Sequence, residues 1–205
     1  MREKNYTGLI PVNTSGKEIN AEAVAEAKNF EEAKAVYTTV KKRLLDVNNW
    51  HHIAGIMSAH FQLTDLNGKE VTRNAETGDY FKIDIPGPGS KTGDGYDWAH
   101  VEEMKEINKP DVDSVGIRVR PSANPLNKDA NVAHFYSNEA TSTFIVTREN
   151  NTIIAGIYDR NTKPNEEAES ITDQIRHTAI GVSALSNFSE IQWQNLVEGL
   201  LKSER

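Results

Sequence analysis

Apolar positions divide the chain into a helical beginning, a long middle with alternating residues and a helical end. From Phe30 onward they recur every three or four residues, which is the spacing of one helix face and predicts a helix over about 30–46. Asn29 and Glu32 have the spacing of a capping pair at the start of this helix. Alanine and glutamate over 21–27 predict a shorter helix before it.

From residue 55 the period of the apolar positions becomes two, which predicts strands. In one such segment Phe61 and Leu63 alternate with His60 and Gln62. Polar turn residues keep the connections short, and short connections favour antiparallel pairing. We therefore expect about six or seven antiparallel strands, at 56–65, 78–86, 98–105, 114–121, 132–137 and on either side of the Glu149-Asn150-Asn151 turn.

The C-terminal part returns to helical spacing. Ile171, Ile175 and Ala179 mark one helix, which Gly181 weakens. A capping box at Ser189 and Gln192 predicts the start of a last helix. Its apolar stripe must be covered by the sheet or by a partner, and consists of Trp193, Leu196, Val197, Leu200 and Leu201.

This order of elements predicts an α+β fold, with a curved antiparallel sheet, an N-terminal helix and C-terminal helices. A small SH3-like or other β-barrel that carries helices is the alternative. The length suits a single domain over 1–205. We expect residues 1–20 as a loose extension, 21–47 as helical, 55–160 as the sheet and 167–202 as helical.

The composition excludes several classes of function. The chain has 30 acidic and 23 basic residues, a net charge of -7 that argues against nucleic acid as a partner. It has no signal-peptide pattern and no apolar run of about 18 residues, so we expect a cytoplasmic protein without a membrane span, unless a signal peptide has been trimmed. Because cysteine is absent, disulfides and cysteine-ligated metals are excluded.

One glycine-rich stretch, KIDIPGPGSKTGDGYDW over 82–98, invites comparison with a phosphate-binding loop. A Walker A loop needs glycine immediately before its Lys-Thr pair, and Ser90 occupies that place. Pro86 and Pro88 also remove N–H groups that such a loop would donate. The stretch is more typical of a stiff strand connection, and Tyr96 and Trp98 at its end could form the rim of a binding site.

Leu44, Asp46 and Trp50 form a Leu-x-Asp-x-x-x-Trp turn between the first helix and the sheet. With the long C-terminal amphipathic helix, this turn resembles the START-like or SRPBCC helix-grip superfamily. The resemblance implies an apolar ligand held between sheet and C-terminal helix, and some members act on that ligand. The segments 86–97 and 108–130 are insertions relative to the compact versions of that fold.

The leading hypothesis is a protein that is not an enzyme and that binds a small or apolar ligand, or a protein partner, between sheet and helix. Its expected contacts are Trp50, His60, Tyr96, Trp98 and Arg118. A second hypothesis is an enzyme in which imidazole and carboxylate serve as acid and base, or hold a metal, with the residues His60, His100 and Asp97. A third is a structural subunit that packs its C-terminal stripe on a second copy.

The six histidines show none of the usual metal motifs. No two have the i, i+4 spacing of a helical zinc site, and HExxH is absent. We therefore predict no metal and no cofactor.

Overall fold

The computed structural model describes residues 3–55, 59–85, 90, 92–127, 131–165 and 179–202, and only the backbone for 179–186. Seven strands form one antiparallel sheet in the order β1-β7-β6-β5-β4-β3-β2. The strands are β1 (Lys17–Glu26), β2 (His60–Thr64), β3 (Tyr80–Asp84), β4 (Asp97–Asn108), β5 (Val112–Pro121), β6 (Thr141–Glu149) and β7 (Thr152–Thr162). The helices are α1 (Phe30–Leu45), a 3-10 turn (Val47–Asn49), α2 (Trp50–Ala54) and α4 (Ala179–Leu201).

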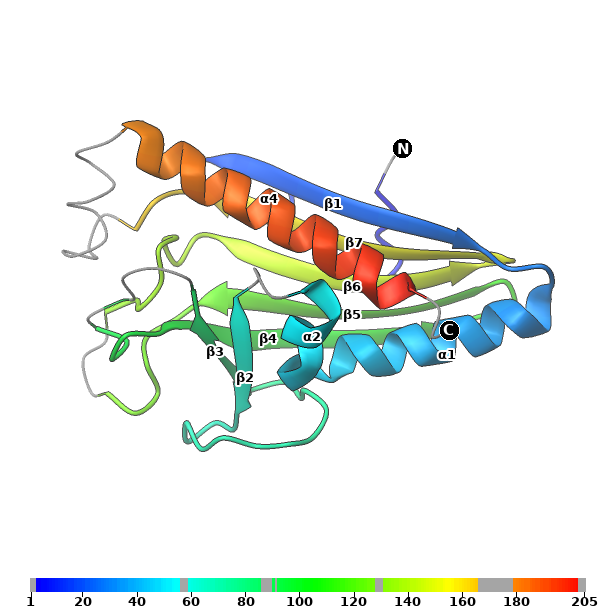
Figure 1. The fold of residues 1–205 in the computed structure, drawn as a ribbon, viewed down its shortest axis with the longest axis horizontal. Coiled ribbons are helices and arrows are strands. Elements are labelled where there is room, and N and C mark those ends of the chain that lie inside the picture. The colour runs from blue at the N-terminus through cyan, green and yellow to red at the C-terminus, as the bar shows by residue number, and fades with distance from the viewer. Residues whose placement is uncertain are drawn as a thin grey trace.

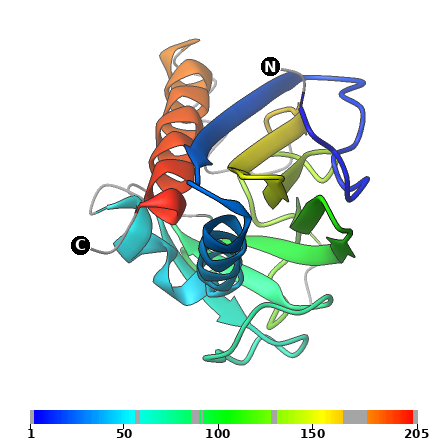
Figure 2. The ribbon, with the colours of Figure 1, turned by 90° about the vertical axis from the view of Figure 1, so that its right-hand side faces the viewer.

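The sheet is curved, and the helices pack against one of its two faces (Figures 1 and 2). α4 runs along β1 and β7, whereas α1 lies toward the other end of the molecule, roughly parallel to the strands, and contacts β6. We call the covered side the helix face and the other side the outer face. The predicted α+β fold with a curved antiparallel sheet is confirmed, and the linear strand order is that of an open sheet and not of a barrel.

α1 begins and ends close to where its apolar spacing predicted. The Asn29 side chain accepts a hydrogen bond of 2.9 Å from the backbone N–H of Glu32, and the Glu32 carboxylate accepts one of 2.6 Å from the N–H of Lys28. The first interaction satisfies a donor that the first helical turn leaves unpaired, and the second ties the residue before the cap to the same turn. The buried face consists of Ala33, Tyr37, Val40 and Leu44.

The prediction of a helix over 21–27 is wrong, because these residues belong to β1. Ala21 lies opposite Ile157 and Ala23 opposite Ala155 in an antiparallel ladder with β7. Pairing along β7 outweighs the helix propensity of alanine and glutamate, as tertiary context commonly does. Upstream of β1, Leu9 is buried against the outer face beside Gly116.

α4 is continuous through Ser189, so the predicted helix start at that residue is wrong. Gln192 serves the loop before β2 instead of a cap, since its side-chain oxygen accepts a hydrogen bond of 2.9 Å from the N–H of Ala59. The predicted helix around Ile171 and Ile175 lies outside the described residues. The apolar stripe of α4 faces the sheet, with Trp193, Leu196, Val197 and Leu200 buried.

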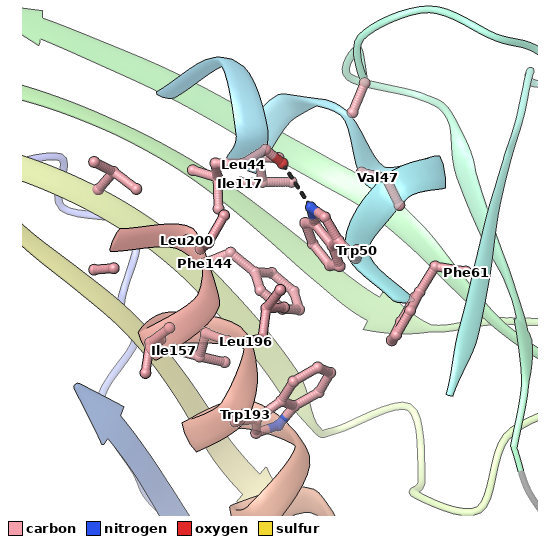
Figure 3. Close-up of a cluster of buried hydrophobic side chains, with 14 of the residues drawn as sticks. Leu44, Val47, Trp50, Phe61, Ile117, Phe144, Ile157, Trp193, Leu196 and Leu200 are labelled. Atoms are coloured by element: carbon pink, nitrogen blue, oxygen red, sulfur yellow. Dashed lines mark hydrogen bonds between the residues drawn. The ribbon is translucent and has the colours of Figure 1, made fainter. Parts of the chain in front are cut away.

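Aromatic and aliphatic side chains together fill the space between α4 and the sheet (Figure 3). The Trp50 ring lies 4.7 Å from that of Phe144 and 5.3 Å from that of Phe61, and Trp193 lies 5.2 Å from Phe144. The Trp50 indole donates a hydrogen bond of 3.1 Å to the Leu44 carbonyl at the end of α1. The Trp50 hydrogen bond and ring contacts therefore hold the Leu44 to Trp50 turn against the core.

Two predictions concern the segment 132–137 and the glycine-rich stretch 82–98. The predicted strand over 132–137 is a single bridge between Tyr136 and Pro164. In the glycine-rich stretch, the described residues turn back on Ser90, whose carbonyl accepts hydrogen bonds from the N–H groups of Gly93 and Gly95. Asp94 and Gly95 both have positive φ, at 55° and 90°, which suits a tight turn.

Candidate functional site

A small cavity of about 40 Å³ lies between α4 and the β2, β3, β6 and β7 side of the sheet. Its apolar walls include Ala59, Phe61, Ile83, Phe135, Phe188 and Trp193. Its polar lining consists of His134, Ser142, Asp159, Ser189 and Gln192. We call this space the α4 cavity. Apolar walls with a few converging polar groups are typical of small-molecule sites.

Asp159 is the charged side chain in the lining of the α4 cavity. Strand alternation places it on the helix face of β7, directly opposite Ser142 of β6, and only 1% of it is exposed. One carboxylate oxygen, Oδ2, accepts a hydrogen bond of 2.8 Å from the Trp193 indole. The other, Oδ1, is buried and accepts no hydrogen bond from any part of the chain that the structure describes.

The environment of Asp159 opposes its charge. Burial raises its pKa to about 6, and the Ser142 hydroxyl, the Trp193 indole and Arg160 reduce the effect of burial. The carboxylate is therefore mostly ionised at pH 7. A buried polar atom without a partner is costly, and such atoms in native proteins point to a role that packing does not explain.

His134 lies in the same lining and is uncharged. Its Nδ1 accepts a hydrogen bond of 2.9 Å from the backbone N–H of Tyr136, which places the ring proton on Nε2. Burial lowers the pKa of His134 to about 3. The imidazole can therefore act in the cavity only as a neutral group.

Asp97 lies next to His134 on the helix face. Its Oδ2 accepts a hydrogen bond of 3.1 Å from the N–H of Phe135 and is 4.0 Å from Nδ1 of His134, which is too far for a hydrogen bond. Burial raises the pKa of Asp97 to about 7. Asp97 and Asp159 are thus two acids held among apolar groups.

The structure does not bring the predicted ligand contacts together. Trp50 lies in the core on the helix face, as a packing residue between rings. By strand alternation His60, Trp98 and Arg118 lie on the outer face, and Lys82 of that face stacks its ammonium 4.2 Å above the Tyr96 ring. The roles expected for these five residues stay predictions.

Trp98 and Arg118 already have neighbours on the outer face. Trp98 is buried, and its indole donates a hydrogen bond of 3.2 Å to the Gly93 carbonyl of the glycine-rich turn. Arg118 forms ion pairs of 3.0 Å with Glu102 and with Glu103. The His60 ring is exposed and lies 4.4 Å from that of His51.

The predicted acid and base residues are also separated. Asp97 lies on the helix face, whereas His100, three residues later on β4, is on the outer face beside the Tyr80 ring. His60 lies at the start of β2, opposite Asp84. Within the described ranges, no three or more His, Cys, Asp or Glu side chains are grouped so that they could hold a metal ion.

The sequence analysis did not identify Asp159 and His134 as site residues, although the alternation of apolar residues in β7 indicates that Asp159 is buried. Asp159 continues the alternation of Ile153, Ala155 and Ile157 in β7, so the period of two already places a carboxylate among apolar neighbours. Asp97 stands in the same way before Ala99 in β4. His134 lies in a loop, where no periodicity reports its burial.

The sequence matches no protein-family model and no curated protein. The structure is similar to that of a hypothetical protein from Helicobacter pylori, with 13% identity, a TM-score of 0.52 and coverage of 97% of this chain and 98% of that chain. At this identity the likeness shows the fold alone.

Other similar structures include norcoclaurine synthase from Thalictrum flavum, with 9% identity, a TM-score of 0.34 and coverage of 89% and 96%. A major latex-like protein from Panax ginseng has 12% identity, a TM-score of 0.33 and coverage of 87% and 99%. Both are of the helix-grip type. Their scores are too low to carry an argument about family, so membership of the helix-grip superfamily stays a prediction. No helix among the described residues is long and apolar enough to cross a membrane.

Proposed function

We propose that this protein binds a small molecule with an apolar body in the α4 cavity. The observation that carries the proposal is the unpartnered oxygen of Asp159, which is buried in a space otherwise walled by rings and aliphatic groups. Ligand sites combine an apolar surface with few, well-placed polar groups, and the α4 cavity has both.

The size of the cavity limits the ligand. A volume of about 40 Å³ is roughly three times the 10–15 Å³ that a cavity needs to hold one water molecule. The space accommodates a polar headgroup, and the rest of a ligand must displace lining side chains. Phe188 is half-buried at the rim of the cavity and is the side chain that we expect to move.

A titration with three single-ring compounds tests the proposal. We expect at least one of toluene, benzyl alcohol and benzylamine to shift the Trp193 indole and Ala59 amide resonances of ¹⁵N-labelled protein in a saturable way. Ala59→Leu adds a larger side chain to the cavity wall and should abolish these shifts. Ala123→Leu is the matched control, because Ala123 lies outside the lining and should leave binding unchanged.

The proposal fails if none of the three compounds shifts these resonances, or if Ala59→Leu leaves binding intact while the fold is preserved. Binding that is lost equally in the Ala123→Leu control would also contradict it, since the ligand would then lie elsewhere.

A further inference from the structure

Among the residues that the structure describes, the charge of Asp159 has no compensating cation on its own side of the sheet. Arg160 follows it directly, but strand alternation points the guanidinium to the outer face. There Arg160 pairs with Glu3 and donates a hydrogen bond of 2.8 Å to Asn20. The guanidinium is thus paired on the outer face, and it lessens the effect of burial on the carboxylate without cancelling it.

The lining of the α4 cavity supplies no other positive charge. None of the described residues that form it is lysine or arginine, and His134 is neutral. The Trp193 indole donates to Oδ2 and the Ser142 hydroxyl also favours the carboxylate, but Oδ1 has no hydrogen bond from the described residues. The described part of the cavity lining therefore presents an acceptor and a negative charge, but no cation.

Aromatic rings surround this acceptor. Phe61, Phe135 and Trp193 all line the cavity. The faces of such rings attract cations, most strongly where water is excluded. A compact cation beside Oδ1 would meet both a carboxylate and ring faces, and a volume of about 40 Å³ suits an ammonium group.

We propose that the ligand of the α4 cavity is a small organic amine, whose protonated nitrogen donates a hydrogen bond to Oδ1 of Asp159. An alcohol also has a donor, but it would leave the carboxylate charge uncompensated in an apolar space. An anion would meet a like charge. This inference rests on the proposed function, since it names the ligand class for the same cavity.

The test compares benzylamine with benzyl alcohol, which share a ring and differ in the headgroup. In unaltered protein at pH 7.5 we expect benzylamine to bind about tenfold or more tightly than benzyl alcohol, as measured by the titration of the Trp193 indole resonance. In Asp159→Asn, which keeps the shape but removes the charge, the affinity for benzylamine should fall about tenfold and that for benzyl alcohol by less than about threefold.

Asp84→Asn is the matched control, because Asp84 is an exposed acid on the outer face and should change neither affinity. Equal binding of the two compounds to unaltered protein would overturn the amine proposal while leaving the proposed function intact. Binding of neither compound, nor of toluene, would overturn the proposed function itself. If Asp159→Asn does not fold, the comparison in unaltered protein still decides between these outcomes.

Discussion

Asp97 and Asp159 are acids on the apolar face of the sheet, and each is buried without a charged partner among the described residues. Burial raises the pKa of Asp97 to about 7 and that of Asp159 to about 6. In the unfolded chain both groups ionise near pH 4, so between about pH 4 and 7 the folded state binds more protons than the unfolded state. Their contribution to stability is therefore lost as the pH rises through this window.

His134 acts in the opposite direction. Its pKa falls to about 3 in the folded protein, so below about pH 6.5 the unfolded state binds the extra proton, and stability rises with pH over that range. The three groups partly offset one another, and only a variant at a single site isolates the contribution of Asp97.

Asp97→Asn should stabilise the protein at high pH and not at low pH. The amide oxygen can still accept the hydrogen bond from Phe135, and the buried charge is gone. We expect the free energy of unfolding at pH 8 to rise by roughly 1–3 kcal/mol, with no gain at pH 4. Urea denaturation at pH 4, 6 and 8 measures this difference, with the exposed Asp84→Asn as the control. A gain of the same size at all three pH values would contradict the pKa shift.

Among the elements, α1 and β1 show what local sequence can predict. The spacing of Ala33, Tyr37, Val40 and Leu44 lies within one helix, so the sequence predicts α1 without knowledge of its neighbours. β1 depends on β7, whose paired residues lie more than a hundred positions later, and its own residues favour a helix. The glutamates and alanines there carry only a weak alternation, with Ile19 and Ala21 buried.

The difference between local patterns and distant contacts also explains why the start of α4 was predicted wrongly and why the cavity residues were missed. Ser189 and Gln192 have capping spacing, but the loop before β2 uses the Gln192 side chain, and no local pattern reveals that contact. The fold class, most strands and the apolar stripe of α4 could be predicted because they follow from periodicity. The α4 cavity could not be predicted, because Asp159, His134 and Trp193 come from three segments that are distant in the sequence.

The contribution of the Asn29 cap to the stability of α1 can be tested by substitution. Asn29→Ala removes the acceptor for the N–H of Glu32 and should lower the free energy of unfolding by about 1 kcal/mol. Chemical denaturation measures the loss. Asn67→Ala is the control, because that asparagine is exposed in a turn and donates to Asp65 through its backbone, which the substitution retains. Equal losses in both variants would show that the cap has no specific role.

For the whole molecule, the N-terminal segment adds a third layer to the sheet and helices. Leu9 is fully buried over Gly116, where a side chain at the glycine would come within 2.8 Å of Leu9. Ile10 joins Ile145 and Tyr158 in a small apolar cluster on the outer face. The outer face is therefore partly covered by the chain itself.

Leu9→Ala should destabilise the whole protein and not merely loosen its N-terminus. Removal of a fully buried leucine side chain costs about 2–4 kcal/mol, so the midpoint of urea denaturation should fall markedly. Val12→Ala, at a side chain that is 78% exposed, is the control and should change the midpoint little. If both variants unfold at the midpoint of the unaltered protein, the N-terminal segment does not contribute to global stability.

The apolar stripe of α4 bears on assembly. Trp193, Leu196 and Leu200 are buried against the sheet of the same chain, so the surface that was expected to pack on a second copy is already covered (Figure 3). A homo-oligomer would have to use another surface.

The pairing of β1 with β7 also has a consequence for synthesis. The paired residues are separated by 126 positions at one end of the ladder and by 145 at the other. A ribosome therefore releases β1 early and completes its partner only near the end of translation. During that interval β1 is an unpaired edge, and Lys17, Glu18, Glu22 and Glu26 place charges along it. Charges of this kind disfavour the pairing of an exposed strand with another chain, so the residues that gave β1 a helical composition are also suited to an unpaired strand.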